Sequence, residues 1–97
     1  MLKQNERKQL KALAAQLTIR YQLGKKEIGP TVIDMFDKAL TAHELIKIDV
    51  MKSVDGNLME IALDLSSKLN ADIVDLIGRV IILFRRNKEN PKIRFKK

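Results

Sequence analysis

The chain has 97 residues, 45% of them hydrophobic and 32% charged, which is typical of one folded domain and argues against a disordered segment. It lacks cysteine, so disulfides and thiolate metal sites are excluded. The net charge of +7 divides into +6 over residues 1–26, −6 over residues 27–75 and +7 over residues 76–97. If the fold joins the two basic ends, they form a positive face that favours a nucleic acid or another anionic surface as partner.

The first helix is predicted over residues 3–17, because apolar side chains recur there at helical spacing: Leu10, Leu13, Ala14 and Leu17. Three cations of this helix are expected to point away from the apolar face: Arg7, Lys8 and Lys11. A short strand over residues 19–23 and a turn over residues 24–29 follow.

The second helix is predicted over residues 31–42, with Pro30 in its first turn, where a missing N–H costs nothing. Its apolar stripe includes Met35 and Phe36. The strand over residues 45–50 alternates apolar residues with Lys47 and Asp49, so it is expected to be half buried with these two side chains outward.

The later elements are a helix over residues 57–69 that stops at Asn70, a strand over residues 72–77 and a strand over residues 80–84. The last strand is apolar throughout, which favours a central place in the sheet. The domain is therefore expected to cover residues 1–86. The basic tail, residues 87–97, is expected to be loose unless Ile93 and Phe95 dock.

The predicted order is α-β-α-β-α-β-β, an α/β (α+β) fold in which a mixed four-stranded sheet packs with helices. Right-handed crossovers make the first three strands parallel, and the last strand fits between the second and third. The turns at residues 24–29 and 78–79 then share one edge of the sheet, so Lys25, Lys26 and Arg79 are expected to be neighbours.

The opposite edge of the predicted sheet carries another group of cations. Arg85 and Arg86 leave the last strand there, near Arg20 and the end of the first helix. At the first edge, Gly24 exposes backbone N–H groups beside two lysines, a combination that suits a phosphate.

Residues 9–85 resemble the YhbY family, also called the CRM domain (chloroplast RNA splicing and ribosome maturation). The resemblance rests on Leu-Gly-Lys at residues 23–25, Ala-Leu-Thr-Ala-His-Glu-Leu-Ile-Lys-Ile at residues 39–48 and Asp-Leu-Ile-Gly-Arg-Val-Ile-Ile-Leu-Phe-Arg at residues 75–85. It implies a fold like the C-terminal domain of translation initiation factor 3 and RNA binding without catalysis. For a stand-alone copy it also implies association with precursors of the large ribosomal subunit.

The family's turn reads Gly-x-x-Gly, a loop that KH domains use to clamp a nucleic-acid backbone. Here Glu27 replaces the second glycine, which puts tight clamping in doubt, although the lysines can still contact phosphates. The candidate RNA-binding residues are Gly24, Lys25, Lys26, Arg79, Arg7, Lys8, Lys11, Arg20 and Arg85.

Catalysis, a cofactor, a metal and a small-molecule substrate are not expected. His43 is the only histidine and lies at the C-terminal end of a helix, where a cation is favourable, so it is expected to be structural. The carboxylate pairs Asp34/Asp37 and Asp72/Asp75 lack a histidine or a third acid nearby in sequence that could complete a metal site. Phe36 and Phe84 are expected in the core, which leaves no aromatic pair to stack bases.

We expect an RNA-binding protein that assists assembly of the large ribosomal subunit and binds rRNA or its precursor particle through phosphate and shape contacts. It is expected to be monomeric and cytoplasmic, without a membrane partner. One alternative is a protein-interaction module that docks a basic ribosomal protein through its acidic second and third helices. DNA binding ranks third, because no helix offers a base-reading set of Arg, Asn or Gln.

Overall fold

The computed structural model describes residues 2–18, 20–24, 29–54 and 56–96. Every predicted helix and strand is present, with ends within two residues of the predicted ones. The elements are α1 (Gln4–Gln16), β1 (Tyr21–Leu23), α2 (Pro30–His43), β2 (Leu45–Val50), α3 (Leu58–Leu69), β3 (Asp72–Ile77) and β4 (Val80–Phe84).

The four strands form one mixed sheet in the order β1-β2-β4-β3. β1 is parallel to β2, and β4 is antiparallel to both β2 and β3, so the first three strands run in one direction. The predicted topology is confirmed, including the central place of β4, whose residues from Ile81 to Phe84 are buried. A register shift between Ile73 and Asp75 interrupts the pairing of β3 with β4.

Local sequence explains where helices begin and end. The Asn57 side chain accepts hydrogen bonds from the N–H groups of Met59 at 2.8 Å and Glu60 at 3.4 Å, which caps the start of α3. Asn70 ends the same helix in the left-handed conformation, with φ of 53°. Pro30 occupies the first turn of α2 as predicted.

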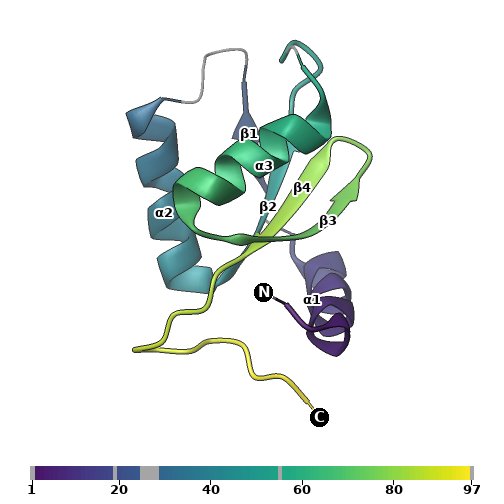
Figure 1. Cartoon of the computed structure of the whole chain (residues 1–97), viewed down its shortest axis with the longest axis vertical. Coiled ribbons are helices and arrows are strands. Elements are labelled where there is room, and N and C mark those ends of the chain that lie inside the picture. The colour runs from purple at the N-terminus through teal and green to yellow at the C-terminus, as the bar shows by residue number, and fades with distance from the viewer. Residues whose placement is uncertain (1, 19, 25–28, 55, 97) are drawn as a thin grey trace.

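Helices α2 and α3 cover one face of the sheet (Figure 1) and enclose the larger core. Phe36 from α2, Leu65 from α3 and Ile48 from β2 are completely buried. The Tyr21 ring packs edge-on against Phe36, with 6.1 Å between ring centroids. Met35 was predicted to join the apolar stripe of α2, but it is 42% exposed.

Helix α1 and the tail pack against the other face of the sheet. Because this face is also covered, β2 is not half buried as its alternation predicted, and Lys47 is only 6% exposed. The sequence of β2 could not indicate a second layer, since the helix that covers Lys47 precedes it by some thirty residues. The buried members of this second core are Leu10, Ala14, Leu45, Val74, Ile82 and Phe84.

The tail after β4 is not loose, although it forms no helix or strand. Ile93 and Phe95 pack against the second core, and the Phe95 ring lies 5.7 Å from that of Phe84. Further along, the N–H of Lys96 donates to the side-chain oxygen of Gln9 at 2.7 Å, and its carbonyl accepts from the Gln9 amide at 2.6 Å. The two basic ends of the chain are therefore held together (Figure 1).

Candidate nucleic-acid interface

The C-terminal ends of β1 and β3 lie at the same edge of the sheet, as the predicted topology requires. Met51 links them, since its N–H donates to the carbonyl that ends β1 at 3.0 Å, and its sulfur lies 3.8 Å from where a Cβ on Gly24 would sit. Arg79 donates from Nη2 to the Met51 carbonyl at 3.1 Å. Gly24 and Arg79 thus both contact Met51, while Lys25 and Lys26 lie outside the described residues.

Arg79 fastens the β3–β4 turn to the end of β2. Its Nε donates to the carbonyl of Val50 at 3.0 Å, and the N–H of Val50 donates back to the Arg79 carbonyl at 2.8 Å. A guanidinium has five N–H donors, so these contacts leave some of them for a ligand at the edge. Arg79 combines a structural role with a positive charge beside Gly24.

Arg7 was predicted to point away from the apolar face of α1 into solvent, but it points toward the sheet. Its Nη1 donates to the carbonyls of Ile73 at 2.7 Å and Val74 at 2.9 Å. These carbonyls lie at the register shift of β3, where an irregular strand leaves backbone groups without ladder partners. Arg7 therefore joins α1 to the sheet, and its half-buried side chain is poorly placed to be an RNA contact.

Arg85 is likewise committed to the protein. It donates to the Asp37 carboxylate at 2.7 Å, to the Asp37 carbonyl at 2.9 Å and to the Thr41 hydroxyl at 2.9 Å. It also donates to the carbonyl of Leu69, at the end of α3, at 2.9 Å. These four bonds connect the end of β4 to both α2 and α3, so Arg85 has a structural role and is not a solvated cation.

Three other candidates are exposed, namely Lys8, Lys11 and Arg20. The Lys11 ammonium lies 3.9 Å from the carboxylate of Asp75. An exposed ion pair at this distance contributes little, so the charge of Lys11 is accessible to a ligand. The predicted site is thus divided between structural arginines and solvent-facing cations.

Glu44, which the sequence did not single out, anchors the tail through a fully buried carboxylate. One carboxylate oxygen accepts hydrogen bonds from the N–H groups of Lys92 and Ile93, both at 2.7 Å. The other accepts from the N–H of Asn87, also at 2.7 Å. Arg86 adds a guanidinium nitrogen at 3.2 Å from both oxygens.

The Arg86 guanidinium lies against two aromatic rings, 5.4 Å from the centroid of Phe84 and 5.1 Å from that of Phe95. These distances allow cation–π attraction to both rings. Arg86 also donates to the carbonyl of Ile93 at 2.6 Å. Its side chain therefore connects Glu44, the second core and the tail.

Two opposing effects act on the pKa of Glu44. Burial, the largest effect, raises it, whereas the N–H groups of Asn87, Ile93 and Lys92 and the charge of Arg86 lower it. The hydrogen bonds and the charge prevail together, so the pKa lies below its ordinary value of 4.5. Glu44 is accordingly an ionised anchor at neutral pH.

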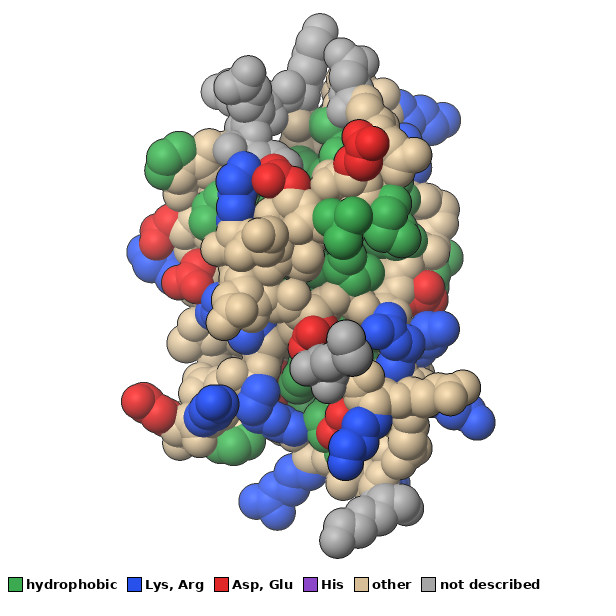
Figure 2. Space-filling model, viewed as in Figure 1, with side chains coloured by type: hydrophobic (Ala, Val, Ile, Leu, Met, Phe, Trp, Pro, Cys, Tyr) green, Lys and Arg blue, Asp and Glu red, His purple; other side chains and the backbone are tan. Residues whose placement is uncertain are grey.

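Docking of the tail adds cations to those of α1. We call the exposed cations of α1 and of tail residues 91–96 the basic end. Figure 2 shows Lys and Arg side chains gathered over the lower part of the molecule, where Figure 1 places the tail and the start of α1. This surface carries positive charge from both ends of the sequence, which is the arrangement that attracts a polyanion. The basic end consists of Lys8, Lys11, Lys92, Arg94 and Lys96.

Two further properties of the described residues bear on function. Among them, no group of three or more His, Asp or Glu side chains is placed to hold a metal ion. In the same part of the chain, no helix has the length and apolar character needed to cross a membrane.

A model of the CRS1/YhbY (CRM) domain family matches residues 2–85. The chain is 31% identical over 93 residues to "Probable RNA-binding protein YqeI" of Bacillus subtilis (strain 168), covering 96% of this chain and 97% of that protein. It is 24% identical over 91 residues to "Probable RNA-binding protein PA4753" of Pseudomonas aeruginosa, covering 94% of this chain and 88% of the other.

A solved structure is similar over the whole fold. The solution structure of the hypothetical protein SAV1595 from Staphylococcus aureus, described as a candidate RNA-binding protein, matches with a TM-score of 0.80 and 31% identity. The match covers 99% of this chain and 100% of that one, so it includes the segment that follows β4. The family match, the relatives and the shared fold agree, and the chain belongs to the CRS1/YhbY (CRM) domain family.

Proposed function

We propose that this protein binds RNA of precursor large ribosomal subunits and assists their assembly. The observation that carries the proposal is the basic end, in which the docked tail places Lys92, Arg94 and Lys96 with the cations of α1. Two relatives and a structural neighbour with RNA-binding names support RNA as the polyanion. We further propose that the protein acts as a monomer in the cytoplasm.

Recognition is expected to rest mainly on phosphates and RNA shape. Phe36 and Phe84 are buried, and Phe95 is packed against Phe84 and Arg86. The described residues therefore offer no exposed pair of rings for consecutive bases, unlike the stacking surfaces of other single-strand binders. Contacts to phosphate make the affinity fall steeply with salt.

A second contact is proposed at the edge that carries Gly24 and Arg79. This edge lies at the top of Figure 1, and the tail lies at the bottom, along the longest axis of a molecule measuring 40 × 26 × 24 Å. An RNA that touches both places must extend along the protein. The two contacts can therefore be tested independently, the first with the tail cations and the second with Lys25 and Lys26.

The first experiment is sedimentation of the tagged protein from cell lysate through a low-salt sucrose gradient, with the rRNA of each fraction identified. We expect co-migration with immature large subunits that is lost at high salt. The double variant Lys92→Glu/Arg94→Glu tests the basic end, and Lys25→Glu/Lys26→Glu tests the turn. Migration at the top of the gradient without rRNA would contradict the proposed function.

A matched control has the same change in net charge on the opposite helices. Lys38 and Lys68 are exposed and form ion pairs with Asp34 at 3.0 Å and Asp64 at 2.9 Å on α2 and α3. The variant Lys38→Glu/Lys68→Glu is expected to keep its rRNA association. If it loses association as fully as the tail variant, only overall charge matters and the basic end is not the site.

The alternative of a protein-interaction module is less well supported. Asp34 and Asp64 are paired with lysines, and Asp37 is held by Arg85. The acidic helical face is thus partly neutralised within the molecule. A defined protein partner retained after removal of RNA would nevertheless favour this alternative.

A further inference from the structure

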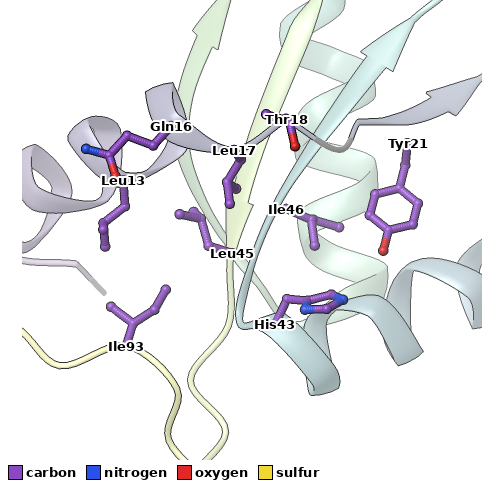
Figure 3. Close-up of a pocket in the computed structure, with 9 residues that line it drawn as sticks. All are labelled: Leu13, Gln16, Leu17, Thr18, Tyr21, His43, Leu45, Ile46 and Ile93. Atoms are coloured by element: carbon purple, nitrogen blue, oxygen red, sulfur yellow. The ribbon is translucent and has the colours of Figure 1, made fainter.

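A cavity of about 440 Å³ lies between the end of α1, the start of β2, the end of α2 and the tail (Figure 3). Its position follows from the unequal lengths of two paired strands. β1 begins at Tyr21, which is opposite Ile48, so β2 extends three residues beyond the start of β1. Leu17 and Thr18, which follow α1, line the hollow together with Leu45 and Ile46 of this extension.

Most of the wall is apolar. Leu13 comes from α1, Leu17 caps the end of that helix, Leu45 comes from β2 and Ile93 from the tail. Leu13 and Leu17 are 39% and 37% exposed, although helical spacing groups them with buried residues. They face the cavity instead of the core. Glu44 helps to hold the tail in this wall, since its carboxylate accepts a hydrogen bond from the N–H of Ile93.

The cavity also has polar groups on its wall. Tyr21 and His43 lie on the same side of it in Figure 3, opposite the leucines. Gln16 lines it from α1. Within the described part of the chain, these three side chains make no hydrogen bonds, so their donors and acceptors are available to a ligand.

We propose that this cavity receives one unstacked nucleobase of the bound RNA; the proposal rests on the proposed function and adds a base-reading site to it. A base has flat apolar faces to contact the leucines and a polar edge to meet the Tyr21 hydroxyl and the His43 imidazole. An apolar protein side chain would leave these polar groups without partners. The volume lies in the range of roughly 300–1,000 Å³ that small-molecule sites occupy.

Exposed cations next to lining residues in the sequence favour a nucleotide over a neutral ligand. Arg20 directly precedes Tyr21, and Lys92 and Arg94 stand on either side of Ile93 along the chain. Glu44, the carboxylate next to His43 in sequence, is buried and paired with Arg86, so it does not oppose a phosphate. A nucleotide that inserts its base can therefore place its phosphate among cations.

The chain provides two natural reporters of this site. Tyr21 is the only tyrosine, tryptophan is absent, and His43 is the only histidine. Tyrosine fluorescence and the imidazole NMR signals of the unmodified protein therefore each come from a single residue of the cavity wall. The probes are an RNA hairpin with an unpaired loop and a blunt RNA duplex with the same number of phosphates.

If the proposal is correct, both RNAs bind, but the hairpin binds about tenfold more tightly. Only the hairpin then quenches Tyr21 fluorescence and shifts the His43 signals. His43→Ala should reduce the ratio of hairpin to duplex affinity to about one. The control Met59→Ala, on the exposed side of α3, should leave the ratio unchanged.

Three results would overturn the base site. Equal affinities with no change at Tyr21 or His43 would remove the base site and leave the proposed function intact. Failure of both RNAs to bind would remove both proposals. A Tyr21 signal that changes when the protein alone is diluted would assign the cavity to a second copy of the chain.

Discussion

Arg86 donates from one guanidinium nitrogen to both carboxylate oxygens of Glu44, at 3.2 Å each. The two residues are separated by 42 positions in the sequence, and each also binds the tail. Because Glu44 is fully buried, its hydrogen bonds cannot be replaced by water without opening the structure. This pair makes the tail a part of the fold and brings its cations to α1.

Replacing Glu44 with glutamine should destabilise the protein and release the tail. The amide keeps the size of the side chain but removes the charge that three N–H groups and Arg86 recognise. Hydrogen bonds to charged groups contribute about 1.5–3 kcal/mol each, so we expect Glu44→Gln to lower the free energy of unfolding by about 2–3 kcal/mol. Urea unfolding measures the loss, and hydrogen exchange at Lys92 and Ile93 measures release.

The control for this prediction is Glu89→Gln. Glu89 is an exposed carboxylate in the tail itself, so its replacement should change the free energy of unfolding by less than about 0.5 kcal/mol. Equal effects of the two substitutions would contradict the role of Glu44 as an anchor.

Acid should weaken the hold on the tail. The pKa of Glu44 in the folded protein lies below 4.5, because its hydrogen bonds and Arg86 together outweigh burial. Its stabilising contribution is therefore fully present above pH 4.5 and is lost as the pH falls through the folded pKa. The stability difference between the native protein and Glu44→Gln should shrink on going from pH 7 toward pH 3. A difference that stayed constant would show that ionisation of Glu44 does not matter.

Arg7 and Lys8 are adjacent cations with different expected roles. Arg7→Met removes two hydrogen bonds to strand carbonyls and should lower the free energy of unfolding by about 1–3 kcal/mol. Lys8→Met, at an exposed position, should change it by less than about 0.5 kcal/mol. Thermal or urea unfolding of both variants checks this, and similar losses would contradict the assignment of Arg7 to the β3 irregularity.

The variant Gly24→Ala should keep the stability of the native protein but bind RNA more weakly. Among the described residues, a Cβ there would meet the Met51 sulfur alone, at 3.8 Å, an ordinary contact, so the free energy of unfolding should change little. Any weakening of RNA binding by Gly24→Ala then reflects close approach of the ligand to this backbone. Gly78→Ala is the comparison variant. Gly78 has φ of 58°, which is unfavourable for a residue with a Cβ, so this substitution should lower the free energy of unfolding by about 1–2 kcal/mol. Unchanged RNA affinity of Gly24→Ala would argue against a backbone contact at this turn.

The salt dependence of RNA binding should identify the cations that touch phosphates. Each phosphate contact contributes roughly −0.7 to −0.9 to the slope of log affinity against log salt concentration. Lys92→Ala and Arg94→Ala should therefore each reduce the slope by about one unit. The same measurement on Lys68→Ala, paired with Asp64 on α3, should return the native slope. A native slope for the tail variants would exclude these two residues as phosphate contacts.

Regular structure was largely predictable because local patterns determine it. The apolar run of β4 indicated a central strand, and Asn70 indicated the end of α3. Lys47 was predicted wrongly because its burial depends on α1, a distant element that covers the second face of the sheet. Alternation within β2 contains no information about that cover.

The candidate site was less predictable, because the partners of its residues are backbone groups. Glu44 binds N–H groups 43 to 49 residues further along the chain, and Arg7 binds carbonyls 66 and 67 residues away. Backbone groups are the same at every position, so no residue pattern encodes such contacts. Charge segregation did indicate that joined ends would make a basic face, but only the tail's docking identifies Lys92, Arg94 and Lys96 as its members.

The contact between Gln9 and Lys96, 87 residues apart, bears on how the chain reaches its native state. Helix α1 is made early during translation, yet the apolar partners that cover Leu10 and Ala14 begin at Leu45 and continue to Phe95. Such non-local contacts raise the contact order, which slows folding. The apolar face of nascent α1 is therefore fully covered only after nearly the whole domain has emerged from the ribosome.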